Sequence, residues 1–201
     1  MKPVFAKGTR AQASLSASAA KGALTLPVND ADSIFSVGEL LFCSEADGSE
    51  LECLGPVTAV DGVGVTVALG LASAKSGGAK VWTPETSLLW PLGRSAPLRR
   101  TYHSGVEVQR SVGGALYHTR LADPYWEEPL VFERVARADY AQYEGWFIDT
   151  LRGGVEEFTF VDEERRVSAV KILNTAVEQE ESPAGVARVA IQLARVGTSY
   201  V

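Results

Sequence analysis

The chain has 201 residues and a mass of 21.5 kDa, which is room for one large domain or two small ones. With 46% hydrophobic and 22% charged residues, its composition excludes wholesale disorder, a collagen-like chain and a disulfide scaffold. The formal charge of −6 and the pI near 5.0 argue against a protein that binds duplex DNA tightly. The sequence shows neither a secretory leader nor an apolar run of the roughly 20 residues that a membrane-spanning helix needs, so we expect a soluble protein made in the cytoplasm.

Residues 1–21 are small and polar, and they predict an extended or weakly ordered N-terminal arm. Residues 22–83 then carry short runs of alternating hydrophobicity separated by turn residues such as Asp61 and Gly62. These runs predict a small β-barrel or sandwich. Its expected strands are residues 23–28, 39–43, 50–60, 64–69 and 80–82.

Cys43 and Cys53 flank a predicted turn at residues 45–49. If that turn closes a hairpin, the two sulfur atoms lie roughly opposite each other, where a bridge is sterically conceivable. A reducing cytosol favours two free, half-buried thiols instead.

Residues 84–97 contain Pro84, Pro91 and Pro97, which cannot donate to a sheet ladder, and they predict a linker. The linker also carries apolar side chains that would be costly to leave in water. We therefore expect it to lie across one module or against a neighbouring subunit. These apolar residues are Leu88, Leu89, Trp90, Leu92 and Leu98.

Residues 98–201 predict a second β module, a sandwich or barrel with one helix packed on it. The expected strands are residues 105–112 and 116–120, paired as a hairpin, and then 130–135, 156–161, 166–173 and 186–196. The fold class is therefore mainly β.

The one helix is expected to begin at Asp139 as N-cap, with Gln142 completing a capping pair, and to end at Gly153 and Gly154. Gly145, inside the helix, predicts close packing against a sheet. The expected packing residues are Tyr140, Tyr143, Trp146, Phe147 and Leu151 on the helix, and Phe158 and Phe160 on one face of the next strand.

No residue pattern predicts chemistry. His103 and His118 could approach each other across the expected hairpin, but a metal site would need a third ligand. The paired glutamates stand next to each other in strands and loops, where neighbouring side chains point to opposite faces, so we interpret them as solvated charge. We expect no catalytic residue, no metal and no cofactor.

Tyr125 and Trp126 stand on a predicted loop between two prolines. Aromatic rings on a rigid loop can anchor a protein partner, pack internally or stack on a sugar, and the sequence leaves these readings open. With Trp90 and Leu89 of the linker, they are the candidate partner-contact residues.

The second module resembles the distal tail proteins of long-tailed phages and gene transfer agents. The resemblance rests on the order of elements and on YHSGVEVQRSVGGALYHTR (102–120), LVFER (130–134), DYAQYEGWFIDTLRGG (139–154), EEFTFVD (156–162) and VSAVKIL (167–173). The first module, with LTLPVNDADSIFSVGELLFC (24–43), is similar to small β modules that recur in phage tail-tip proteins.

The resemblance implies a tail-tube-like domain that assembles into a ring, commonly a hexamer, between the tail tube and the tip complex of the virion. DNA would pass through its lumen without specific binding, and the protein would be assembled in the host cytoplasm. The extra module precedes the ring domain, whereas many distal tail proteins carry it within or after that domain, so a tube terminator remains an alternative. A carbohydrate-binding adhesion module and a hydrolase built on acidic pairs are the alternatives from other classes.

Overall fold

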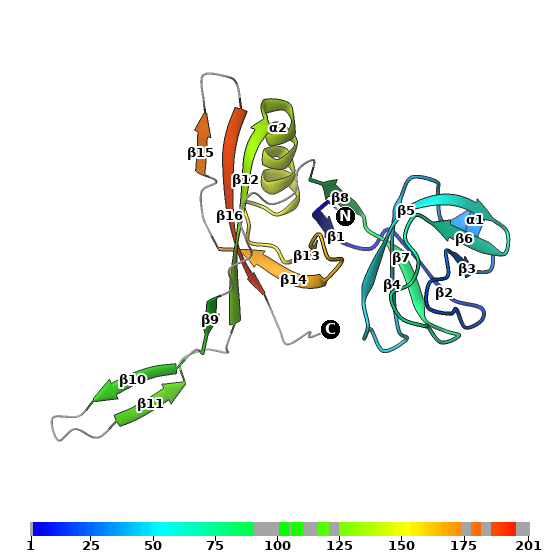
Figure 1. Cartoon of the computed structure of the whole chain (residues 1–201), viewed down its shortest axis with the longest axis horizontal. Coiled ribbons are helices and arrows are strands. Elements are labelled where there is room, and N and C mark those ends of the chain that lie inside the picture. Colours follow the sequence, from blue (N-terminus) through cyan, green and yellow to red (C-terminus); the bar gives the residue numbers. More distant parts are fainter. Residues whose placement is uncertain are drawn as a thin grey trace. The chain divides into compact units, whose positions relative to one another are not determined.

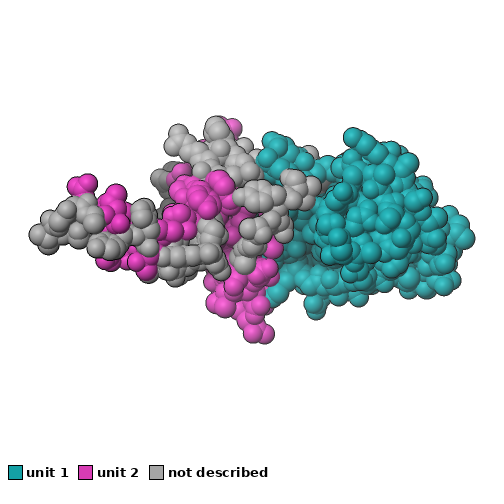
Figure 2. Space-filling model, turned by 90° about the horizontal axis from the view of Figure 1, so that it is seen from below, with its two compact units in different colours: residues 1–90, 158–167, 200–201 teal, residues 91–157, 168–199 magenta. Residues whose placement is uncertain are grey.

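The computed structural model describes residues 2–90, 101–104, 106–110, 116–120, 125–173, 178–181 and 186–195. The described chain is mainly β, as the sequence predicted. It divides into two compact units, coloured separately in Figure 2. Unit 1 comprises residues 1–90, 158–167 and 200–201, and unit 2 comprises residues 91–157 and 168–199.

Most of unit 1 is a six-stranded half-barrel in the order β2-β7-β4-β5-β6-β3, with one helical turn, α1 (Ala31–Ile34) (Figure 1). Its strands are β2 (Ala11–Ser14), β3 (Thr25–Pro27), β4 (Leu40–Ser44), β5 (Glu52–Asp61), β6 (Gly64–Val67) and β7 (Lys80–Thr83). All five strands predicted for residues 22–83 are confirmed. Leu41, Leu54, Val65 and Val81 are fully buried in its core.

A bulge bends β5 at Gly55. The register with β4 shifts between Leu40↔Pro56 and Phe42↔Cys53, which leaves one extra residue on β5. Gly55 occupies it at φ +72°, a left-handed conformation that glycine adopts without steric cost. A methyl group at this position would lie only 3.4 Å from Leu69 Cδ1, so the bulge also brings the backbone close to the chain after β6.

The rest of unit 1 is a strand group in the order β8-β1-β13, formed by β1 (Val4–Lys7), β8 (Thr86–Leu89) and β13 (Phe158–Val161). Phe5 pairs with Leu88 on one side and with Phe160 on the other. Phe5, Trp90 and Phe160 are buried, and the Phe5 ring lies 6.0 Å from that of Trp90 and 5.4 Å from that of Phe160.

The structure therefore differs from the predicted N-terminal arm. Val4, Phe5 and Ala6 are fully buried, because β1 pairs with β13. The sequence did not indicate this pairing, since β13 lies about 150 residues further along the chain. Residues 86–89 of the predicted linker instead form strand β8, which pairs with β1 within unit 1. The remaining linker residues, 91–97, and Leu98 fall outside the described residues.

Unit 2 is built on strands in the order β14-β16-β12-β9, with β15 also paired to β16. These strands are β9 (Thr101–His103), β12 (Tyr125–Ala136), β14 (Val167–Ile172), which begins at the last residue of unit 1, β15 (Glu178–Glu181) and β16 (Val186–Arg195). A separate two-stranded sheet pairs β10 (Val106–Arg110) with β11 (Leu116–Arg120), as predicted, while its turn lies outside the described residues.

The helix α2 (Arg137–Gly145) continues into a π-helical turn, η1 (Trp146–Thr150), where the Leu151 N–H donates to Trp146 O five residues back. The predicted N-cap at Asp139 is wrong. Strand β12 runs directly into the helix, so Ala136 is the N-cap, and Asp139 lies in the first turn, where its charge favours the helix dipole. None of the described helices is long and apolar enough to cross a membrane.

The predicted close packing at Gly145 is also wrong, because a methyl group there would meet nothing within 4 Å. The tight approach is at Gly154, where a methyl group would lie 3.1 Å from Phe147 Cε2 and 3.3 Å from Ile172 Cβ. The helical segment ends just before the predicted glycines: Leu151 is the C-cap of η1, and Arg152, Gly153 and Gly154 follow with positive φ.

Candidate assembly surface and groove

In the β10–β11 hairpin, strand β10 is not covered by the described part of the chain. All five residues of β10 are exposed. Because paired strand residues share a face, the register places Val106, Val108, Arg110 and Leu116 on one side and Glu107 and Gln109 on the other. Val108 and Leu116 are 55% and 56% exposed. An isolated two-stranded hairpin is marginally stable in water, so contacts beyond those of the described residues would stabilise this one.

The main sheet of unit 2 has one buried and one open face. Leu130, Phe132 and Val135 of β12 are buried, as are Val189, Ile191 and Leu193 of β16. Glu128 is buried on the same face, and its Oε2 accepts a hydrogen bond from Arg195 Nη2 at 3.2 Å. This pairing allows a carboxylate to lie inside an otherwise apolar layer.

The open face is polar and its side chains pair with one another. Gln192 Nε2 donates to Glu127 Oε2 at 3.1 Å, and Arg188 Nε lies 3.7 Å from Glu133 Oε1. Such exposed pairs contribute little to stability, and they leave a solvated surface rather than an apolar one.

The predicted loop around Tyr125 and Trp126 is instead the start of β12. Trp126 pairs with Tyr102 of β9 and with Arg195 of β16. The Trp126 ring is half-buried and lies 4.9 Å from the Tyr102 ring, so it packs within unit 2. The flanking prolines led to the prediction of a loop, because proline is rare inside strands. In the structure Pro129 lies within β12, opposite Gln192.

Of the other candidate partner residues, Leu89 is 54% exposed, but Trp90 is fully buried and cannot stack on a sugar or a partner. The predicted packing residues are all buried: Tyr140, Tyr143, Trp146, Phe147 and Leu151 in the helical segment, and Phe158 and Phe160 in β13. Burial raises the pKa of Tyr143.

His103 and His118 do not face each other across the hairpin. His103 belongs to β9 and pairs with Tyr125, and its Nε2 lies 3.2 Å from Glu127 Oε2. His118 belongs to β11 and pairs with Val108.

The cysteines are both free and buried. Cys43 pairs with Glu52 and Cys53 with Phe42, so the two are one residue out of register. Their side chains therefore point to opposite faces of the sheet, which excludes the conceivable bridge. Burial raises the pKa of Cys43 to about 12 and that of Cys53 to about 11, which keeps both thiols protonated and unreactive near neutral pH.

A buried ionic cluster joins two segments of unit 1, residues 50–52 and 72–75. The Lys75 side chain is fully buried, and its Nζ lies 2.8 Å from Glu50 O, 2.8 Å from Ser73 Oγ and 3.1 Å from Glu52 Oε1. Glu52 also accepts from the Ala72 N–H at 2.6 Å. Burial alone would lower the pKa of Lys75, but hydrogen bonds and charges of Glu52 and Glu50 outweigh it, and the pKa is raised.

Arg165 connects the turn after β13 to the half-barrel. Its Nη2 donates to Cys53 O at 3.1 Å and to Gly70 O at 3.0 Å. Asp162, fully buried at the start of the same turn, accepts from the backbone N–H groups of Glu164 and Arg166 at 2.9 Å. These contacts hold the turn in a defined position within unit 1.

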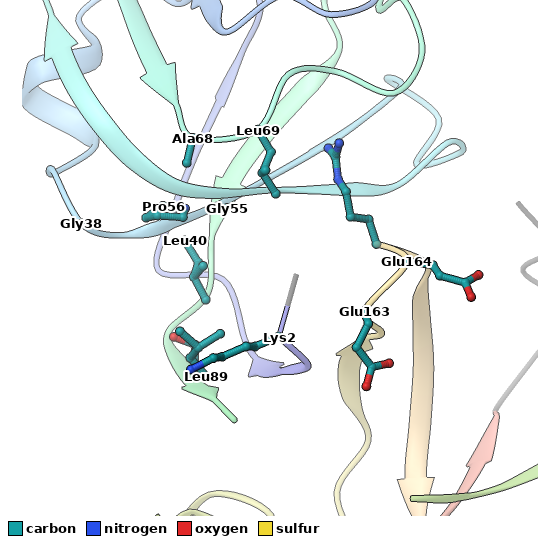
Figure 3. Close-up of a pocket in the computed structure, with 12 residues that line it drawn as sticks. Lys2, Gly38, Leu40, Gly55, Pro56, Ala68, Leu69, Leu89, Glu163 and Glu164 are labelled. Atoms are coloured by element: carbon teal, nitrogen blue, oxygen red, sulfur yellow. The ribbon is translucent and has the colours of Figure 1, made fainter. Parts of the chain in front are cut away.

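Beside this turn, unit 1 carries a groove of about 600 Å³ (Figure 3), which we call the β8 groove. Its apolar lining comes from the half-barrel and from Leu89 of β8, and its charged lining from Lys2 and the turn. The lining residues are Lys2, Gly38, Leu40, Gly55, Pro56, Ala68, Leu69, Ser87, Leu89, Glu163, Glu164 and Arg165. The sequence did not predict this groove, since its residues come from six separate segments.

Comparisons with known proteins add no relative: no family model matches the chain, and no curated protein matches it.

Proposed function

We propose that the chain is a structural protein of a phage tail tip, in which unit 2 assembles into a ring, commonly of six copies, between the tail tube and the tip complex. Its work is assembly rather than catalysis. The observation that carries the proposal is the β10–β11 hairpin, whose β10 strand is exposed along its whole length. The resemblance of residues 102–173 to distal tail proteins is the reason for proposing that this assembly is a ring.

The energetics favour a partner for the hairpin. Covering an aliphatic side chain of this size contributes about 1.5–3 kcal/mol when it is fully removed from water. Val106, Val108 and Leu116 are three such side chains on one face. Their burial against a neighbouring copy offsets part of the entropy that ordering the hairpin costs.

The charge balance agrees with a conduit for DNA. Cations along a bore would bind phosphates and release counterions, which would slow passage. The chain carries 19 basic against 25 acidic residues, and the cations Arg188 and Arg195 on β16 lie near the carboxylates of Glu133 and Glu128. Each of these two arginines therefore has a carboxylate beside it that reduces its attraction for phosphates.

The test is the mass of the full chain under native conditions over a concentration series, followed by negative-stain imaging. We expect a closed oligomer with rotational symmetry. Val108→Lys, which places a charge on the hairpin face, should raise the concentration needed for assembly by at least about tenfold, equivalent to ~1.4 kcal/mol. Val155→Lys is the matched control, because Val155 is also an exposed valine of unit 2. A solitary chain at every concentration would contradict the proposal.

A further inference from the structure

We infer that the apolar face of the β10–β11 hairpin of one copy packs on the exposed face of the helical segment α2–η1 of a second copy. The inference rests on the proposed self-assembly and names the two surfaces that meet. The hairpin face consists of Val106, Val108, Arg110 and Leu116. The helix face consists of Ala141, Glu144, Gly145, Ile148 and Asp149.

The helix face is the side of α2 and η1 that the chain leaves open. Tyr143 and Phe147 of the same segment are buried, and α2 lies against β12 and β16 (Figure 1). Spacings of three and four residues place the members of the helix face on one side of the segment. Ile148 is 57% exposed, and Glu144 and Asp149 are exposed as well. The described chain therefore leaves a large aliphatic side chain between two carboxylates in water.

Gly145 lies at the centre of this face, and nothing within the chain explains it. A glycine inside a helix is destabilising relative to alanine. Its backbone is helical, with φ −58° and ψ −47°, so the conformation does not require a glycine. A methyl group there would meet nothing within 4 Å, so no described neighbour requires one either. The bare backbone leaves space in which a side chain of another molecule, such as Val108, can pack.

The two carboxylates of the helix face are also unfavourable for the helix itself. Glu144 and Asp149 lie near the C-terminal ends of α2 and η1, where the helix dipole disfavours negative charge. Among the described residues neither has a basic partner, and the nearby Arg152 lies 3.5 Å from Glu156. Residues that weaken their own element without a compensating contact in the chain are expected at functional surfaces.

The hairpin face has the complementary composition. Val106, Val108 and Leu116 are exposed aliphatic side chains. Arg110 is exposed beside them and has no acidic partner in the described part of the chain, while Glu107 lies on the opposite face of β10. The hairpin thus brings an apolar surface with a positive charge to an apolar surface flanked by negative charges. Such charge complementarity favours this partner over an uncharged one.

The contact is heterologous, because the hairpin of each copy meets the helix of the next. Contacts of this kind close into a ring when the rotation between copies divides a full turn. Both surfaces belong to unit 2, which is the unit proposed to form the ring.

The first experiment fills the space at Gly145 in the full chain. Gly145→Leu should not lower the stability of the solitary chain, because leucine is a better helix former than glycine and no described atom obstructs it. The same substitution should raise the assembly concentration by at least about tenfold, because the added side chain occupies the space of the hairpin. Gln142→Leu, at an exposed helical residue outside the helix face, is the matched control and should leave assembly unchanged.

The second experiment reverses charges. Arg110→Glu, and separately the pair Glu144→Arg and Asp149→Arg, should each raise the assembly concentration by at least about tenfold, because like charges facing each other at an interface are strongly unfavourable. The triple variant exchanges the charges of the two faces and should restore most of the loss. Glu107→Arg and Glu157→Arg are the matched controls, since both carboxylates are exposed and lie outside the two faces.

The third experiment is cross-linking. The variant carries Val108→Cys and Ile148→Cys, and the natural cysteines are both buried. A short bis-maleimide should give a ladder of linked copies, and each single variant should give none beyond dimers. If the chain assembles but forms no ladder, or if the triple charge variant restores nothing, the inference is wrong while the proposed function stands. If the chain never assembles, both are wrong.

Discussion

Strands β4 and β10 have the same length, five residues, but opposite surroundings. Strand β4 lies between β5 and β7, with Leu41 and Cys43 in the half-barrel core and Phe42 in the cluster on its other face. Strand β10 pairs with β11 alone, and all its residues are exposed. The described part of the chain surrounds β4 on both sides and both faces, whereas it leaves β10 exposed along its whole length.

This contrast separates two uses of β structure in one chain. In unit 1, even the charged groups Lys75, Glu52 and Asp162 are buried and paired. In the hairpin of unit 2, apolar side chains are left in water. If copies of the chain assemble through the hairpin, as we propose, stability and assembly depend on different residues, and substitutions can address each separately.

The largest expected effect concerns the strand group that holds the N-terminus. Phe5→Ala should lower the free energy of unfolding by about 3–5 kcal/mol, because it removes a fully buried ring from a well-packed cluster. Denaturant unfolding measures this. Leu24→Ala, at an exposed leucine of unit 1, is the control and should change stability little. Equal effects of the two substitutions would show that residues 4–7 do not belong to the core.

The second effect concerns the ionic cluster. Lys75→Met should cost about 3 kcal/mol at neutral pH, because it leaves the buried carboxylate of Glu52 without its cation. Lys21→Met, at an exposed lysine, should stay within about 0.5 kcal/mol of the natural chain.

The same variant tests how the stability of the protein depends on pH. The pKa of Lys75 is raised above its ordinary value of 10.5, so its contribution to stability is complete below pH 10.5 and is lost as pH rises through the folded-state pKa. Unfolding measured from pH 9 upwards should show this loss in the natural chain and a smaller loss in Lys75→Met. Identical slopes would contradict the role given to the cluster.

The smallest expected effect on stability concerns the ring contact between Tyr102 of β9 and Trp126 of β12. A double-mutant cycle on Tyr102→Ala and Trp126→Ala should give a coupling of about 0.5–1.5 kcal/mol, as expected for two packed aromatic rings. Additive effects would mean that the two rings do not meet in solution, and Trp126 would again be a candidate anchor for a partner.

Much of the fold could be predicted from local patterns. Turn residues such as Asp61 and Gly62 marked the ends of β5 and β6, and alternating valines identified the hairpin. These elements pair with neighbours in the sequence, so their signals lie close together.

The remaining elements depend on partners that are distant in the sequence. Strand β1 is short, and its apolar residues are buried only because it pairs with β13, which begins at Phe158. Strand β8 was not predicted because it lies in a proline-rich segment. The close approach of Phe147 and Ile172 to Gly154 was not predicted either, because no local pattern indicates it. The β8 groove could not be predicted from the sequence, because only the packing of β4, β5 and β8 brings Leu40, Pro56 and Leu89 together.

Hydrogen exchange of the backbone amides of β10 and β11, measured below and above the concentration at which the chain assembles, tests the central claim most directly. We expect rapid exchange in the solitary chain and strong protection in the assembly, while the amides of β4 stay protected in both. Equal protection of the hairpin in the two samples would contradict the claim that copies of the chain cover it.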